Sequence, residues 1–181
     1  MMSRRTPAIV ALLMAGACGC ADRPKAPPLV NDTVYQNDRI GLRFLAPDGW
    51  SLVTRAEPPS SPLPKPVILV AYHLSKGQSH SELEVLAADL AEDSDLGHFL
   101  IEHRIGAAVW TLKPPAETVS INGTEATRHT LTRQDKKGEM RREATAFRRG
   151  GRVYFFIITF AAGDSAARDA ARQSVQSVNW D

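Results

Sequence analysis

The chain has 181 residues, with 22 Lys and Arg, 20 Asp and Glu, and a net charge of +2. This length suits one ordinary domain with a core of its own. The two cysteines, Cys18 and Cys20, both lie near the N-terminus. The rest of the chain therefore has neither a disulfide nor a cysteine-based metal or nucleophile site.

The first twenty residues have the layout of a secretory signal. Arg4 and Arg5 form a short positive region, residues 8–14 are apolar, and small residues lead to Cys18. The alternative is a membrane-spanning helix, but about 11 apolar or small residues are too few where roughly 20 are needed. The cysteine at the cut site makes this segment resemble a bacterial lipoprotein signal, in which the cysteine carries a lipid.

We therefore predict a lipoprotein signal peptide over residues 1–17, with cleavage before Cys18 and a lipid on Cys18. Cleavage before Cys20, with the lipid on Cys20, is the alternative. Neither cysteine is followed by aspartate, the residue that retains lipoproteins in the inner membrane of some bacteria, which favours the outer membrane. The protein is expected to face the periplasm or the cell exterior, and export excludes nucleic acid as a partner.

Residues 18–34 contain Pro24, Pro27 and Pro28 and few residues that could pack, so we interpret them as a tether. In an extended state such a tether reaches up to roughly 40 Å at about 3.1 Å per residue. The globular domain is expected over residues 35–181.

The first part of the domain shows strand patterns separated by turns. Apolar and polar residues alternate over 39–44, and Pro47-Asp48-Gly49 predicts a turn into a second strand, a hairpin-like start in which Trp50 and Leu52 return to the buried face. Residues 57–66 contain five prolines and predict an exposed loop. The continuous apolar run 67–72 is typical of a strand covered on both faces.

The middle of the chain is less clear. Residues 81–90 fit a helix that starts at a capping box, or a strand that pairs back across the turn at 76–78. We favour the strand. The acidic residues at 93–95 then predict the start of a helix that ends before Pro114-Pro115.

The last part of the chain predicts a meander and a closing helix. Asn122-Gly123 is a strong hairpin signal, further turns fall at 135–138 and 150–151, and a second fully apolar strand covers 153–160. Asp164 is expected to cap the final helix. Closely spaced turns favour antiparallel pairing. The two apolar strands, 67–72 and 153–160, have no solvent-exposed face and need other elements packed on both sides. We predict an α+β fold, an α/β/α sandwich whose largely antiparallel sheet has about six to seven strands.

These elements resemble the PsbP-like superfamily of α/β/α sandwiches over roughly residues 35–181. The residues that carry the resemblance are Tyr35-Gln36-Asn37, the stretch from Phe44 to Trp50, Ile121-Asn122-Gly123, and the run from Val153 to Ile158. The resemblance implies a scaffold that binds or assists a protein partner and lacks enzymatic activity. It assigns no site residues, and fold analogy is weak evidence of function.

The charge is unevenly placed along the chain. Residues 82–102 are acidic and 128–152 are mainly basic, which predicts an acidic half and a basic half of the domain. The basic residues are candidate contacts for anionic headgroups or an acidic protein surface. The alternative is that they form cross-strand ion pairs with Glu139 and Glu143. The candidates are Arg128, Arg133, Lys136, Lys137, Arg141, Arg142, Arg148 and Arg149.

The sequence shows no catalytic motif and no metal-ligand spacing among its histidines, which we interpret as ordinary surface or core residues. No cofactor is expected. We therefore expect a lipid-anchored, non-enzymatic binding or assembly module with a protein partner in the cell envelope. The alternatives are a hydrolase-type envelope enzyme whose site the sequence does not reveal, and a structural component that acts only by its mass.

Overall fold

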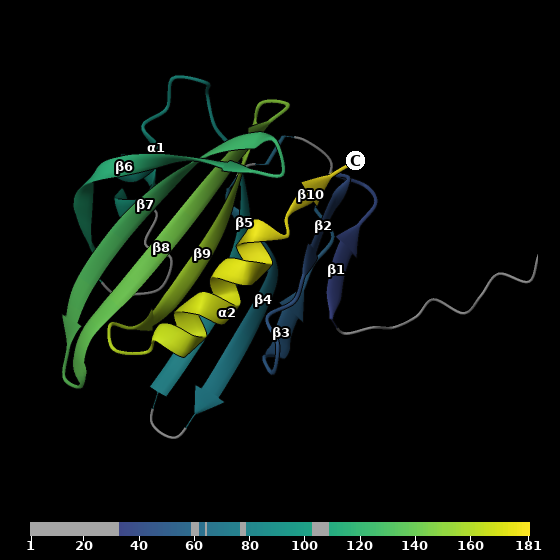
Figure 1. Cartoon of the computed structure of the whole chain (residues 1–181). Helices are drawn as coiled ribbons and strands as arrows, with labels where there is room; N and C mark the ends of the chain where they lie inside the picture. Colours follow the sequence, from purple (N-terminus) through teal and green to yellow (C-terminus); the bar gives the residue numbers. More distant parts are fainter. Residues whose placement is uncertain (1–32, 59–61, 64, 77–78, 103–108) are drawn as a thin grey trace, which may run out of the picture. The chain divides into compact units, whose positions relative to one another are not determined.

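The computed structural model describes residues 33–58, 62–63, 65–76, 79–102 and 109–181, which form ten strands and two helices (Figure 1). The predicted signal 1–17, both cysteines and the tether up to residue 32 lie outside the described residues, as does part of the proline-rich loop. The described part of the chain contains no helix that is long and apolar enough to cross a membrane.

Most of the domain is a seven-stranded sheet in the order β3-β4-β5-β9-β8-β7-β6. Every pairing in it is antiparallel, as the closely spaced turns predicted. Asn122 and Gly123 have φ angles of 48° and 78° and form the predicted turn between β6 and β7. The strands are β3 (Ser51–Arg55), β4 (Val67–Lys76), β5 (Ser79–Asp89), β6 (Thr111–Ile121), β7 (Thr124–Asp135), β8 (Gly138–Arg149) and β9 (Arg152–Ala161).

Residues 81–90 were the ambiguous segment, and the structure confirms the strand. β5 covers Ser79–Asp89 and pairs with β4 on one side and with β9 on the other. It is therefore a central strand of the sheet.

A second, three-stranded sheet in the order β1-β2-β10 corrects the predicted hairpin at the start of the domain. β2 (Leu42–Leu45) pairs with β1 (Val34–Asn37) and β10 (Asn179–Trp180), and not with β3. The turn before Trp50 therefore moves the chain from the small sheet to the edge of the large one. Leu52, expected on the buried face, is 52% exposed, and every residue of the edge strand β3 is exposed.

The described helix α1 (Leu96–Glu102) ends before Pro114 and Pro115, as predicted. Both prolines lie within a strand, because β6 already begins at Thr111. They coincide with the shift of register between Lys113 and Glu117. An edge strand tolerates them there, because a proline cannot donate to the ladder but can occupy a bulge.

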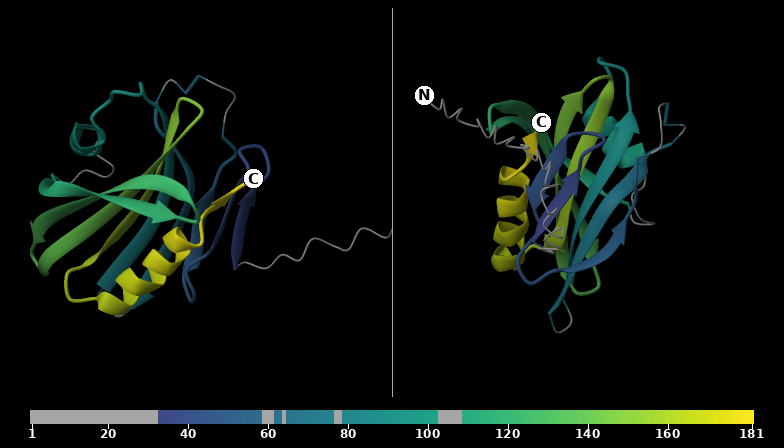
Figure 2. Two further views of the ribbon diagram at one scale, coloured as in Figure 1. Left: turned by 45° about the horizontal axis from the view of Figure 1, so that its top comes forward. Right: turned by 90° about the vertical axis from the view of Figure 1, so that its right-hand side faces the viewer.

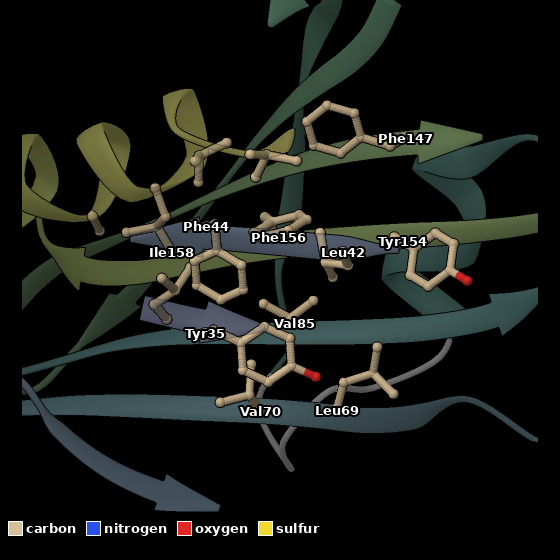
Figure 3. Packing of buried hydrophobic residues seen from close by; sticks show 14 of the residues in the cluster. Tyr35, Leu42, Phe44, Leu69, Val70, Val85, Phe147, Tyr154, Phe156 and Ile158 are labelled. Carbon is tan, nitrogen blue, oxygen red and sulfur yellow. The ribbon is translucent and has the colours of Figure 1, made fainter. Parts of the chain in front are cut away.

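One face of the large sheet packs against the small sheet and helix α2 (Ser165–Gln176) (Figures 1 and 2). Figure 3 shows Phe44 of β2 between Tyr35 of β1 and Phe156 of β9. Its ring centroid lies 5.0 Å from that of Tyr35 and 5.2 Å from that of Phe156. These aromatic contacts join the two sheets.

The opposite face packs against α1, where Phe99 stacks on Phe155 with the ring centroids 5.1 Å apart. β9 is buried along both faces except at Thr159 and Ala161, which confirms the predicted second apolar strand. α1 has 7 residues and α2 has 12, so each covers only part of its face.

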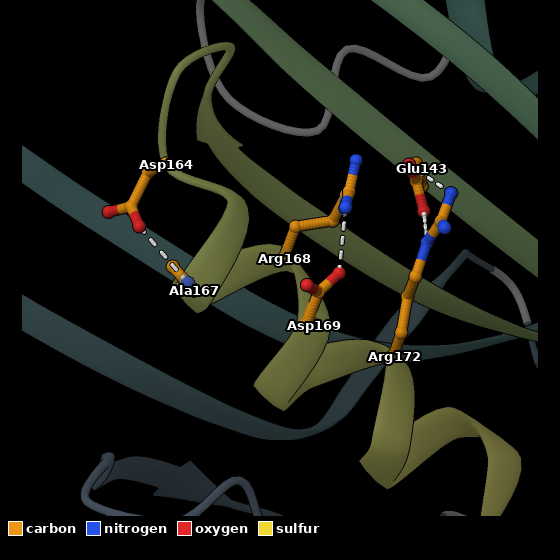
Figure 4. Close-up of polar contacts among 6 residues, drawn as sticks. All are labelled: Glu143, Asp164, Ala167, Arg168, Asp169 and Arg172. Atoms are coloured by element: carbon orange, nitrogen blue, oxygen red, sulfur yellow. Dashed lines mark hydrogen bonds and ion pairs between the residues drawn. The ribbon is translucent and has the colours of Figure 1, made fainter.

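Helix α2 is fixed at its start and along its length by polar contacts (Figure 4). The Asp164 carboxylate accepts a hydrogen bond from the Ala167 N–H at 3.0 Å, which confirms the predicted cap. Further along, Arg172 donates two hydrogen bonds to Glu143 of β8, each 2.7 Å long. The helix is thus joined to the sheet by a bidentate ion pair.

The predicted α+β fold with a largely antiparallel sheet is confirmed, while the α/β/α sandwich fits only in part. Strands dominate the described residues, the helices are short, and the three-stranded sheet shares one face with α2. The prediction missed the small sheet because its strands are short and because β10, at the end of the domain, pairs with β2 near its start.

Candidate functional site

The large sheet has one face that packs against α2, the α2 face, and one that packs against α1, the α1 face. Polar side chains gather on the α1 face, beyond the end of the helix. Antiparallel register places His73, Glu82, Thr159 and Arg142 in one row across β4, β5, β9 and β8. The next row toward the end of the sheet includes His80, Met140 and Arg133. Among the described residues, α1 packs on the apolar rows and not on these polar ones, so the face divides into an apolar half under the helix and a polar half beyond it.

A cavity of about 530 Å³ lies over this polar half. Its size is in the range of sites that hold small ligands. One wall comes from β4 and β5, the opposite wall from the β7–β8 hairpin, and Thr159 and Ala161 of β9 lie between them. The lining residues are His73, His80, Glu82, Arg133, Asp135, Lys136, Lys137, Gly138, Glu139, Met140, Thr159 and Ala161. We call this cavity the sheet-end pocket.

A buried charged cluster adjoins the pocket. Glu84 is 8% exposed and Arg142 is 6% exposed. The Arg142 Nε donates to the Thr159 hydroxyl at 3.0 Å, and its guanidinium carbon lies 4.3 Å from the centre of the Trp110 ring. Arg133 lies 4.9 Å from the same ring. Trp110 thus holds both cations in place through cation–π contacts.

The cluster sets the pKa of Glu84. Burial, and to a lesser extent the nearby charge of Glu82, raise this pKa to about 7, while Arg142 opposes the shift. Both carboxylates have Arg142 as a neighbouring cation, and the raised pKa lets Glu84 hold a proton close to neutral pH.

The two pocket histidines stack on each other. His73 and His80 lie on the paired strands β4 and β5, with ring centroids 5.4 Å apart and planes 15° apart. The sequence interpretation treated them as ordinary residues, whereas the structure places both in the wall of the pocket. Among the residues that the structure describes, no group of three or more His, Cys, Asp or Glu side chains is placed to hold a metal ion.

The structure does not bring the eight candidate basic residues into one surface, because alternate side chains of a strand point to opposite faces. Arg128, Arg141 and Arg149 lie on the α2 face, paired with Glu117, with Glu139 and with the Trp180 ring. Arg133, Arg142 and Arg148 lie on the α1 face. Of the eight, three line the sheet-end pocket: Arg133, Lys136 and Lys137.

The acidic and basic segments of the sequence are folded against each other. Arg152 of β9 forms an ion pair with Asp89 of β5 at 2.6 Å, which lowers the pKa of the Asp89 carboxyl. Arg148 donates to the carbonyls of Ala91 and Ser94 at 2.9 and 2.8 Å. The expected acidic and basic halves therefore meet as neighbouring strands and loops.

Sequence reasoning missed the pocket, although the sequence carries a signal for it. His80, Glu82 and Glu84 alternate along β5 and therefore share one face of a strand. Polar residues on one face of a central strand, beside a buried arginine on β8, indicate a place where the sheet is not covered by apolar packing. The pairing of β5 with β9 was needed to recognise it.

Comparisons with solved structures agree with this architecture. The structure is similar to the solution structure of cyanobacterial PsbP (CyanoP) from Synechocystis sp. PCC 6803, with a TM-score of 0.57 and 16% identity over 82% of this chain and 91% of that chain. The domain therefore has a PsbP-like fold, which confirms that part of the predicted resemblance.

Two other structures are less similar. A protein of unknown function from Pseudomonas aeruginosa, described as a putative regulator, has a TM-score of 0.48 and 14% identity over 80% of this chain and 94% of that chain. A crystal structure from Bacteroides thetaiotaomicron has a TM-score of 0.44 and 10% identity over 78% of this chain and 45% of that chain. No protein-family model matches the sequence, and no curated protein matches it.

Proposed function

We propose that the protein is a non-enzymatic binding or assembly module of the bacterial cell envelope, anchored by a lipid on Cys18, or alternatively on Cys20, and that it binds its partner in the sheet-end pocket. The observation that carries the proposal is the division of the α1 face into an apolar half and a polar half. The polar half is held in shape by cation–π contacts, the Arg133–Asp135 ion pair and stacked rings, and it lines a cavity large enough for a ligand.

The arrangement of the pocket favours binding over catalysis. Glu84, the carboxyl with the perturbed pKa, is not part of the lining and lies one cross-strand row behind Glu82. Arg142 is engaged with Thr159 and Trp110. These groups support the pocket from behind, as positioning residues do, and Glu82 and the hairpin face the cavity.

A crosslinking experiment in intact cells tests the proposal. A photoreactive residue at Lys137, which lines the pocket, is expected to give a discrete adduct of the full chain. The same residue at Glu125, an exposed position of β7 outside the lining, serves as the matched control. The intact mass of the adduct separates a protein partner from a small ligand. Absence of an adduct at Lys137, or the same adduct at both positions, would contradict the use of this pocket.

The alternative is an envelope enzyme, and one observation favours it: a carboxyl whose pKa lies near 7 beside a cavity can act as a general acid or base. Turnover of chromogenic ester, glycoside or peptide substrates by the purified protein, lost in Glu84→Gln, would establish this alternative. Turnover unchanged by that substitution would exclude Glu84 from the chemistry.

A further inference from the structure

The two walls of the sheet-end pocket carry charges of opposite sign. Glu82 is the acidic residue of the β4–β5 wall, beside the stacked pair His73 and His80. The cation near Glu82, Arg142, is not part of the lining, and it contacts the Thr159 hydroxyl and the Trp110 ring. Glu82 therefore presents a negative charge to the cavity, and a cationic group of a ligand can pair with it directly.

The opposite wall has an excess of positive charge. Its two acidic residues are already paired, Asp135 with Arg133 at 3.4 Å and Glu139 with Arg141 at 2.8 Å. Glu139 and Arg141 are two residues apart on β8 and share the α2 face, where Arg141 is paired in register with Phe160 of the apolar core. Lys136 and Lys137 at the hairpin add two further cations to this wall.

Side chains from behind fix the positive wall in place. The guanidinium of Arg133, which belongs to this wall, lies over the Trp110 ring. The same ring contacts Arg142 of the buried charged cluster, so one aromatic residue positions both cations. Trp110 itself is 6% exposed. The charge separation across the cavity is therefore built on packed residues and not only on mobile surface side chains.

We propose that the sheet-end pocket binds a zwitterionic peptide group, with its ammonium group beside Glu82 and its carboxylate beside Arg133 and Lys136. A purely anionic ligand would meet Glu82, and a purely cationic ligand would meet the hairpin lysines. Only a ligand with both charges at opposite ends is complementary to both walls. A cavity of about 530 Å³ has room for such a group of a few residues. This inference rests on the proposed use of the pocket for binding.

Four peptides that differ only in their end charges test the ligand class. The zwitterion Ala-Ala, the anion N-acetyl-Ala-Ala, the cation Ala-Ala-amide and the neutral N-acetyl-Ala-Ala-amide are titrated into the full chain, purified in detergent, and followed by calorimetry. We expect Ala-Ala to bind about tenfold more tightly than either singly charged peptide, because each of those loses one of the two charge contacts. Equal binding of all four peptides, or no binding of Ala-Ala, would overturn the proposal.

Charge-altering variants locate the two ends of the ligand. Glu82→Lys makes both walls positive, so it is expected to abolish the preference for Ala-Ala and to favour N-acetyl-Ala-Ala. Lys136→Glu is expected to shift the preference toward Ala-Ala-amide. Glu125→Lys, the same type of change outside the pocket, is expected to leave the order unchanged. Preserved preference for Ala-Ala in Glu82→Lys would overturn the assigned orientation.

The ligand class and the use of the pocket can fail separately. If the Lys137 adduct forms in cells while Ala-Ala does not bind, the pocket is a binding site and the zwitterionic assignment is wrong. If Ala-Ala binds as expected and the adduct is a protein, the zwitterionic group belongs to a segment of that partner. If the adduct is small, the ligand is a free peptide.

Discussion

At the residue scale, Glu84 links the stability of the domain to pH. Its pKa is raised from 4.5 to about 7, mainly by burial, so between these values the folded state holds a proton that the unfolded chain has lost. This contribution stabilises the fold at low pH and is lost as pH rises through the window. Its upper limit is about 3 kcal/mol.

We expect the unfolding free energy of the wild type to fall between pH 5 and pH 8. In Glu84→Gln this fall is expected to be smaller, because the amide does not titrate. The measurement is urea unfolding of the wild type and the variant at pH 5, 6, 7 and 8. Glu125→Gln, the same change at an exposed position of β7, is the control and is expected to follow the wild type. Parallel pH profiles of the wild type and Glu84→Gln would show that the raised pKa is wrong.

At the element scale, an ion pair between Arg172 and Glu143 adds to the apolar packing that attaches α2 to the sheet. Glu143 has a side chain that is 8% exposed and accepts both hydrogen bonds from Arg172. Arg172→Met leaves this carboxylate buried without its cation, and removing one partner of a buried pair is costly. We expect a loss of about 2–3 kcal/mol of unfolding free energy, less than for a fully buried pair because Arg172 is partly exposed.

Arg168→Met is the matched control on the same helix. Arg168 pairs with Asp169, whose side chain is 56% exposed, and such surface pairs contribute about 0–1 kcal/mol. The double variant Glu143→Gln with Arg172→Met removes the unpaired charge and is expected to recover part of the loss. Equal effects of Arg172→Met and Arg168→Met in chemical denaturation would show that the Glu143 pair does not hold the helix.

Sequence patterns predicted correctly those elements that are determined by residues close together in the chain. The Asn122-Gly123 hairpin, the Asp164 cap and the doubly buried β9 follow from turn chemistry, capping and apolar runs within a few residues. The small sheet and the sheet-end pocket depend on pairings between distant segments, such as β2 with β10 and β5 with β9. Composition was enough to find the basic residues of the meander. Their distribution over the two faces of the large sheet depends on strand register, which composition does not show.

At the scale of the whole molecule, the proposed function needs the domain to be held near a membrane. The described residues begin next to β1, and both cysteines precede them in the sequence. The apolar run that ends at Cys18 is too short to span a bilayer, so a lipid on a cysteine is the proposed anchor.

Single and double cysteine substitutions distinguish the two sites. If Cys18 carries the lipid, Cys18→Ala abolishes labelling with a fatty-acid analogue and changes processing, while Cys20→Ala leaves both unchanged. If Cys20 carries it, the signal is cut after residue 19, Cys18 leaves with the signal, and the two variants exchange their behaviour. The readouts are fatty-acid labelling, the mass of the mature N-terminus and membrane fractionation. Retention of label and of membrane association in the double variant would refute the lipoprotein assignment, and the binding module would then need another means of reaching the envelope.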